Sequence, residues 1–318
     1  MSEARGEEFQ VRAGARLPAL VLKELTRLSP VRATLSLATT WGTIAVLVAL
    51  AVRYPHPGII AGCVVGIAAQ QHALAILTHQ AAHYRMYRRR WLNDLAGKLC
   101  AWPTGASMLT YRIIHRTHHN HLYSPIDPDL ALMAGYPRGR WYLIRKLTKD
   151  LFGLTVVKNQ RYFFGKPNGA QVTNDDTSPA LRAAARRDRH ATTLVQVALL
   201  GASIALGVWS WYLLLWMLPL LTVLQAILRL RAICEHGAVP DTSSPLTAAR
   251  TNLVSWSIRW ILFPFNMNFH IEHHLYPAVP HYRLPACHRA MVEHGLLGGA
   301  EVVRGVGATA RKIFAARA

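Results

Sequence analysis

Four apolar stretches dominate the hydrophobic pattern of the chain, and short polar turns join them in two pairs. The stretches cover residues 33–52, 59–78, 191–208 and 212–228. Each is close to the roughly 20 apolar residues that an α-helix needs to cross the hydrocarbon core of a bilayer. The pattern therefore predicts an all-α integral membrane protein with four transmembrane helices in two hairpins.

Two further apolar stretches are less suited to crossing a bilayer. Residues 92–109 are interrupted by Lys98 and Pro103, and residues 253–265 are short and contain Arg259. We expect the first stretch to be interfacial or re-entrant. The second is typical of an amphipathic helix that lies in the membrane interface.

The polar sequence outside these stretches divides the chain into three parts. We expect an N-terminal arm over residues 1–32, a membrane domain over residues 33–291 and a C-terminal tail over residues 292–318. The first 30 residues lack the apolar core of a signal peptide, so we expect the internal segments to direct membrane insertion.

The charges predict how the chain is oriented in the membrane. Only 16% of the residues are charged, against about a quarter in soluble proteins, and the net charge is +20. The turns of the two expected hairpins contain one basic residue, Arg53. The positive-inside rule then places both termini and the central segment in the cytoplasm. Because the charges follow the expected topology, we predict a bilayer and no nucleic acid as the partner.

Eight of the 16 histidines form three clusters that lie at the ends of the apolar stretches or beyond them. Residues three or four apart lie on one face of a helix, so each cluster can direct its rings at one place. The clustered residues are His79, His83, His115, His118, His119, His270, His273 and His274. We expect the remaining histidines to be surface or packing residues, except His236 and also His121, which could support a ligand without binding the metal.

The chemistry of the clusters favours two metal ions. Neutral imidazole binds iron, copper, zinc and nickel, and eight histidines exceed the four ligands of a structural zinc. The four cysteines are scattered without a CxxC pair, which excludes a zinc ribbon and indicates a reduced compartment. Nitrogen ligands without thiolate, in a site with redox work to do, favour iron. His236 follows the fourth apolar stretch on the same expected side and is a candidate ninth ligand.

These features resemble the membrane fatty-acid desaturase and hydroxylase superfamily. The resemblance rests on the three histidine clusters, on Asn93–Asp94 after the first cluster, on Asp127–Asp129 after the second, and on the run from His273 to Pro277. It extends over residues 78–291. It implies a four-span helical bundle with a cytoplasmic helical cap in which the eight clustered histidines bind two iron ions.

The resemblance also implies a role for His236, with one departure from the family pattern. In acyl-CoA desaturases a histidine after the fourth span completes the ligand set, and an asparagine four residues earlier is associated with a metal-bound water. Here that earlier position is Ala232. We expect Asn268, two residues before the last cluster, as a substitute, unless the alignment of His236 is wrong.

The implied activity is the O2-dependent desaturation of a fatty acyl chain. Hydroxylation or ketolation of a lipid or carotenoid is the alternative, and a histidine-rich metal transporter is a third reading. The chain has no dinucleotide fingerprint, CxxC cluster or heme motif, so we expect no bound nicotinamide, flavin or heme and an external ferredoxin, rubredoxin or cytochrome b5-like donor. The carboxylates expected to orient the imidazoles are Asp94, Asp127, Asp129, Glu235 and Glu272.

Overall fold

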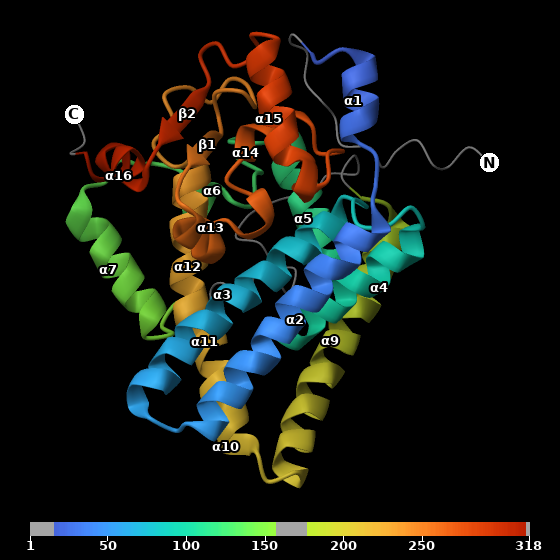
Figure 1. The fold of residues 1–318 in the computed structure, drawn as a ribbon, viewed down its shortest axis with the longest axis vertical. Coiled ribbons are helices and arrows are strands. Elements are labelled where there is room, and N and C mark those ends of the chain that lie inside the picture. Colours follow the sequence, from blue (N-terminus) through green and yellow to red (C-terminus); the bar gives the residue numbers. More distant parts are fainter. Residues whose placement is uncertain (1–15, 157–176, 316–318) are drawn as a thin grey trace.

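The computed structural model describes residues 16–156 and 177–315, so the first part of the expected N-terminal arm lies outside the described residues. A long helical hairpin, α2 (Pro30–Arg53) and α3 (Pro57–Ala82), forms the first pair of expected spans. A side chain caps the start of each helix, and Pro is the first helical residue of both. Ser29 accepts a hydrogen bond from the Arg32 N–H, and His56 Nδ1 accepts one from the Gly58 N–H. The two helices lie side by side (Figure 1).

The second hairpin is less regular. Its first limb is α9 (Pro179–Ala205), and the chain turns at Gly207, which has φ +69°. The second limb consists of α10 (Trp209–Tyr212), a π-helical segment (Leu213–Met217), α11 (Leu218–Leu221) and α12 (Val223–His236). The non-helical φ and ψ of Thr222, −124° and −85°, separate α11 from α12.

Within the described residues, three helical segments are long and apolar enough to cross a membrane. They are α2, α3 and the segment Trp209–His236. The expected third span lies in α9, which is not among the three because the helix begins at Pro179 and its first half is rich in charge. Asp188 in that half is buried and accepts hydrogen bonds from Ser107 Oγ at 2.7 Å and the Leu109 N–H at 3.0 Å.

The segment between the hairpins contains short helices, of which the first two α-helices contact α3 and the next two contact α12. These are α4 (Arg90–Ala101), a 3-10 turn (Trp102–Thr104), α5 (Met108–Asn120), α6 (Leu130–Met133) and α7 (Arg140–Leu151). α4 buries Ala96, Gly97 and Cys100 and exposes Trp91 and Leu99. It is therefore amphipathic and packs alongside α3.

The remaining elements cover the same end of the hairpins. They are α1 (Ala19–Leu25), β1 (Arg250–Leu253), α13 (Trp256–Leu262), a 3-10 turn (Pro264–Asn266), α14 (His270–Leu275), a 3-10 turn (His281–Arg283), α15 (Leu284–Glu293), β2 (Glu301–Arg304) and α16 (Val306–Phe314). The hairpin turns lie at the opposite end of the molecule from α14, α15 and the strands (Figure 1).

Two strands correct the all-α expectation. β1 and β2 form a parallel pair in which Arg250 lies opposite Glu301 and Leu253 opposite Arg304. Strands of four residues show too little alternation of apolar and polar positions to be recognised from sequence. β2 lies in the expected C-terminal tail and pairs with β1. The segment after residue 291 therefore packs onto the rest of the fold. Ile313 of α16 joins Ile233 of α12 in one apolar cluster.

Candidate metal centre

Four helices bring the nine predicted ligands together. His79 lies near the end of α3 and His83 caps it, while His236 is the last residue of α12. α5 provides His115, His118 and His119, and α14 provides His270, His273 and His274. All are buried except His119, which is half-buried. The imidazoles therefore meet where the ends of α3 and α12 approach α5 and α14.

The first group contains five histidines from three helices: His79, His83, His115, His119 and His273. Their nearest nitrogens all lie within 4.8 Å of one another. The Nε2 atoms of His79 and His273 are 2.9 Å apart, as are those of His83 and His115. His119 Nε2 lies 3.0 Å from His273 Nε2.

The second group contains His118, His236 and His274, whose nearest nitrogens also lie within 4.8 Å of one another. His270 joins this group, because its Nε2 lies 2.8 Å from that of His236 and 3.1 Å from that of His274. The two groups are in contact, since the rings of His119 and His274 stack with centroids 4.3 Å apart.

The nitrogens fit two metal ions. Two neutral imidazole nitrogens at hydrogen-bond distance share one proton at most, yet His270 Nε2 and His273 Nε2 each face two others. Burial, followed by the charge of neighbouring histidines, lowers the pKa of His115, His119 and His274 well below its usual value. These rings are neutral at pH 7, which is the form that binds metal.

Asp127 orients the ring of His118. Its Oδ1 lies 2.9 Å from His118 Nδ1, and Asp129 Oδ2 lies 3.5 Å away. Burial alone would lower the pKa of His118, but the two carboxylates outweigh it and raise the pKa to about 9. The Nδ1 hydrogen is directed at Asp127, and a metal ion at Nε2 would displace the hydrogen that this nitrogen carries at pH 7 in the metal-free ring. Asp127 is itself held by the N–H of Tyr123 at 2.8 Å.

His236 is oriented by the backbone. Its Nδ1 lies 2.9 Å from the Ala248 carbonyl, which fixes the hydrogen on that nitrogen and directs Nε2 towards His270. Tyr123 Oη donates to the carbonyl of His236. His236 therefore lies with the second group of histidines, and Ala232 stands where the resemblance implies an asparagine.

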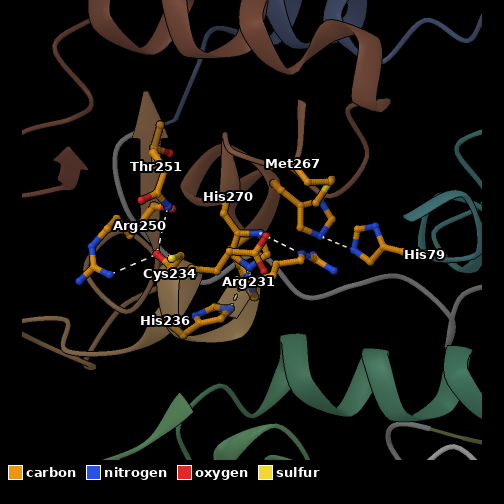
Figure 2. Close-up of polar contacts among 12 residues, drawn as sticks. His79, Arg231, Cys234, His236, Arg250, Thr251, Met267 and His270 are labelled. Atoms are coloured by element: carbon orange, nitrogen blue, oxygen red, sulfur yellow. Dashed lines mark hydrogen bonds and ion pairs between the residues drawn. The ribbon is translucent and has the colours of Figure 1, made fainter. Parts of the chain in front are cut away.

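Glu235 lies behind the second group. Its Oε1 accepts from Arg231 Nε at 2.8 Å and lies 3.5 Å from His270 Nδ1. Arg231, His236 and His270 are labelled in Figure 2. A carboxylate beside the outer nitrogen of a ligating histidine fixes its orientation. Arg231 is therefore a residue of the site that its sequence position did not reveal.

Glu272 anchors the third cluster in the fold. It lies between His270 and His273 in sequence, is fully buried, and accepts from Thr251 Oγ1 at 2.6 Å. Its other oxygen lies 2.5 Å from His288 Nδ1. His288 was expected to be a surface or packing residue, and neither it nor Thr251 carries a sequence signal that links it to α14.

The two other expected supporting residues act at a distance from the rings. Asp94 binds Arg112 at 2.6 Å, and Arg112 donates to the Ala81 carbonyl at 3.1 Å, so this pair holds the end of α3. Asn268 Nδ2 donates to the Asn252 carbonyl at 3.0 Å and holds the approach to α14 against β1. Within the described residues, neither Asp94 nor Asn268 forms a hydrogen bond with a histidine.

A cavity of about 360 Å³ adjoins the second group and is lined by His118, His236 and His270. A smaller cavity of about 50 Å³ shares Tyr111 and Leu228 with it and reaches between α3 and the broken limb of the second hairpin. Apolar residues of that limb, such as Leu220 and Leu224, line the smaller cavity.

Known proteins are similar to this chain in sequence. A family model described as fatty acid desaturase matches residues 55–302. The chain belongs to the fatty acid desaturase family. Membership in this family agrees with the three apolar helical segments and makes the chain a membrane protein.

Three characterised relatives of this desaturase-family chain are similar over 69% of its length. A dihydrorhizobitoxine desaturase of Bradyrhizobium elkanii is 27% identical over 228 residues. Two sn-1 oleoyl-lipid 12-desaturases, from Anabaena variabilis and a Synechocystis strain, are 24% and 25% identical. The similarity covers 63%, 65% and 64% of the lengths of these relatives, in the same order, which is less than two thirds.

Proposed function

We propose that the protein is an O2-dependent desaturase with a di-iron centre, and that its substrate is the acyl chain of a membrane lipid. The observation that carries this proposal is the pair of contacting histidine groups beside a cavity, together with a smaller cavity between apolar helices that shares part of its lining. The names of two relatives support the lipid substrate.

The two groups of histidines would each bind one iron ion. The first group, of five histidines, would hold one iron, and the second, with His118, His236, His270 and His274, the other. Two bound iron ions would supply O2 activation and removal of hydrogen from an unactivated C–H bond. Asp127 and Glu235 would keep His118 and His270 in the orientation for binding.

The cavity would position the acyl chain and keep water from it. Tyr111 and Gln225 lie where the two cavities meet, and Leu220 and Leu224 line the smaller one. The carbon to be oxidised would lie beside His118 and the rest of the chain between α3 and α12. Placement of that carbon decides between desaturation and the alternative, hydroxylation or ketolation.

Orientation and electron supply belong to the same proposal. We place four spans in the bilayer, with the histidine end and both termini in the cytoplasm, following the positive-inside rule. An external ferredoxin, rubredoxin or cytochrome b5-like protein would supply electrons. Exposed arginines near the metal centre, Arg88, Arg89 and Arg90, offer positive charge to an acidic donor or to lipid phosphates.

A second substrate class is favoured by the charged wall of the larger cavity. Arg231, Glu235 and Asp129 line it next to the histidines. The relative that is 27% identical is named for dihydrorhizobitoxine rather than for a lipid. A small polar substrate would place its charged groups against Arg231 and Glu235.

Product analysis tests the proposal. Lipids from cells that express the protein with a desaturase electron-transfer system should gain a double bond only in the presence of O2. The His273→Ala variant should yield none, while His294→Ala, an exposed residue outside both groups, should match the unsubstituted chain. New hydroxyl or keto groups instead of alkenes would establish the alternative outcome. Unchanged lipids from an iron-loaded, electron-supplied protein would contradict a lipid substrate.

A further inference from the structure

A second hollow, separate from the metal centre, lies between α2, α3 and α13. Its volume is about 280 Å³, and it shares no lining residue with the larger cavity beside the histidines. We call it the Arg259 groove. Its lining includes Thr40, Thr43, Gln70, Trp256, Arg259 and Trp260.

Arg259 lines this groove without a counter-ion. Its Nε is buried without a hydrogen-bond partner, and among the described residues no ion pair involves its guanidinium. An arginine next to apolar membrane helices is costly unless its charge is paired. Because the described part of the chain provides no partner, we expect the counter-ion of Arg259 to be an anion bound from outside the protein.

Gln70 is a second polar group directed into the groove. It is 5% exposed, lies in the middle of α3, and has no hydrogen bond from its side chain to the described residues. The next residue differs, because Gln71 Nε2 donates to the Trp216 carbonyl at 2.8 Å. Since the amide of Gln70 lines the groove and has no hydrogen-bond partner in the described chain, it is available to a ligand bound there.

The hydroxyls of the groove offer acceptors. Thr40 Oγ1 donates to the Ser36 carbonyl at 2.9 Å and Thr43 Oγ1 to the Thr39 carbonyl at 2.7 Å. Since each hydroxyl hydrogen is directed at its own helix, the oxygen lone pairs remain for a ligand. The groove thus presents donors from Arg259 and Gln70 beside acceptors from the threonines.

The location of the groove indicates what binds there. Gln70 precedes His79 by nine residues, which is about 14 Å along a helix axis. The groove therefore lies on the bilayer side of the metal centre. Trp256, which is 70% exposed, and Trp260 flank Arg259, and tryptophan is enriched at the level of lipid headgroups.

We propose that the Arg259 groove binds the phosphodiester headgroup of an anionic membrane phospholipid. Arg259 and Gln70 donate to the phosphate oxygens, and the threonine oxygens accept from headgroup hydroxyls such as those of phosphatidylglycerol. The acyl chains then lie along the exposed apolar surface of α2, which includes Leu35 and Val46. Basic pockets between membrane helices bind anionic headgroups in this way. This proposal does not depend on the proposed oxidase chemistry.

Native mass spectrometry of the full chain in detergent tests it, with phosphatidylglycerol and phosphatidylcholine of identical acyl chains as the probes. The unsubstituted protein should retain phosphatidylglycerol in preference. Arg259→Gln and Gln70→Leu should each weaken retention by about tenfold, as expected for losing hydrogen bonds to a charged group. Arg53→Gln, at the exposed turn of the α2–α3 hairpin, should retain the lipid as the unsubstituted chain does.

Metal content and the thermal unfolding midpoint of each variant establish that it is folded. Equal retention of the two lipids by the unsubstituted protein would overturn the proposal, as would undiminished phosphatidylglycerol binding by folded Arg259→Gln. Displacement of the lipid by soluble glycerol 3-phosphate at equal concentration would assign the groove to a free phosphate ester instead.

Discussion

At the scale of single residues, spacing along the chain predicted which histidines meet. The i, i+4 and HxxHH patterns identified eight rings, and all eight lie in the two groups together with His236. Such patterns work because a helix fixes which side chains share a face. They contain no information on which group a ring joins. His118 and His119 are adjacent in sequence but face different groups, which only the packing of α12 and α14 decides.

The partners of the rings were predictable only where they are close in sequence. Asp127 lies nine residues after His118 and was expected, whereas His288 and Thr251 reach Glu272 from separate elements. Contacts of this kind depend on tertiary packing, which a pattern along one segment does not encode.

Asp127 provides the first prediction. Asp127→Asn keeps the shape of the side chain but removes the charge that orients His118. We expect metal affinity to fall about 10- to 100-fold, as for other partners of ligating histidines. A competitive chelator titration with metal analysis measures it. The control is Asp241→Asn, an exposed residue bonded to Ser243. Equal affinities for both variants would contradict the role given to Asp127.

At the scale of elements, the first hairpin was predicted to within a few residues. Its apolar runs are bounded by Ser29–Pro30 and by the turn with Pro55 and Pro57, which stop both helices. The fourth expected span ends at residue 228, and α12 continues beyond it to His236. Arg229, the first residue after that span, is buried in an ion pair with Asp150.

The attachment of α14 to β1 provides the second prediction. Thr251→Val removes the 2.6 Å hydrogen bond to the buried Glu272 carboxylate. The loss should lower the free energy of unfolding by about 1–3 kcal/mol and reduce metal retention. Thermal unfolding in detergent with metal analysis measures both effects.

Thr193→Val is the matched control, because Thr193 is exposed on α9 and its hydroxyl donates only to its own helix at 3.2 Å. That substitution should change stability by less than about 0.5 kcal/mol. If the two variants unfold alike, Glu272 does not couple β1 to the metal centre.

At the scale of the whole molecule, charge and hydropathy predicted a membrane protein with every histidine cluster at one end. The structure has the hairpin turns and α14 at opposite ends of the long helices (Figure 1). The small parallel sheet and the packing of residues after 291 were not predictable. They arise from pairing between Arg250–Leu253 and Glu301–Arg304, which are far apart in sequence.

Orientation in the membrane is the third prediction. Ser210→Cys places a thiol in the exposed turn of the second hairpin, and Arg88→Cys places one near the metal centre. A membrane-impermeant maleimide should label the first in intact bacterial spheroplasts and the second only after permeabilisation. The unsubstituted chain, whose thiols are buried or half-buried, gives the background. The reverse labelling pattern would contradict a cytoplasmic metal centre.

The stoichiometry and identity of the bound metal test the central claim most directly. Protein expressed with ample iron and purified in detergent should contain close to two iron ions per chain, with a Mössbauer spectrum of paired high-spin iron. His83→Ala should disrupt the first group and His236→Ala the second, so each should lose the paired signal, while His294→Ala keeps it. Zinc alone, at a level that none of these substitutions changes, would contradict the account.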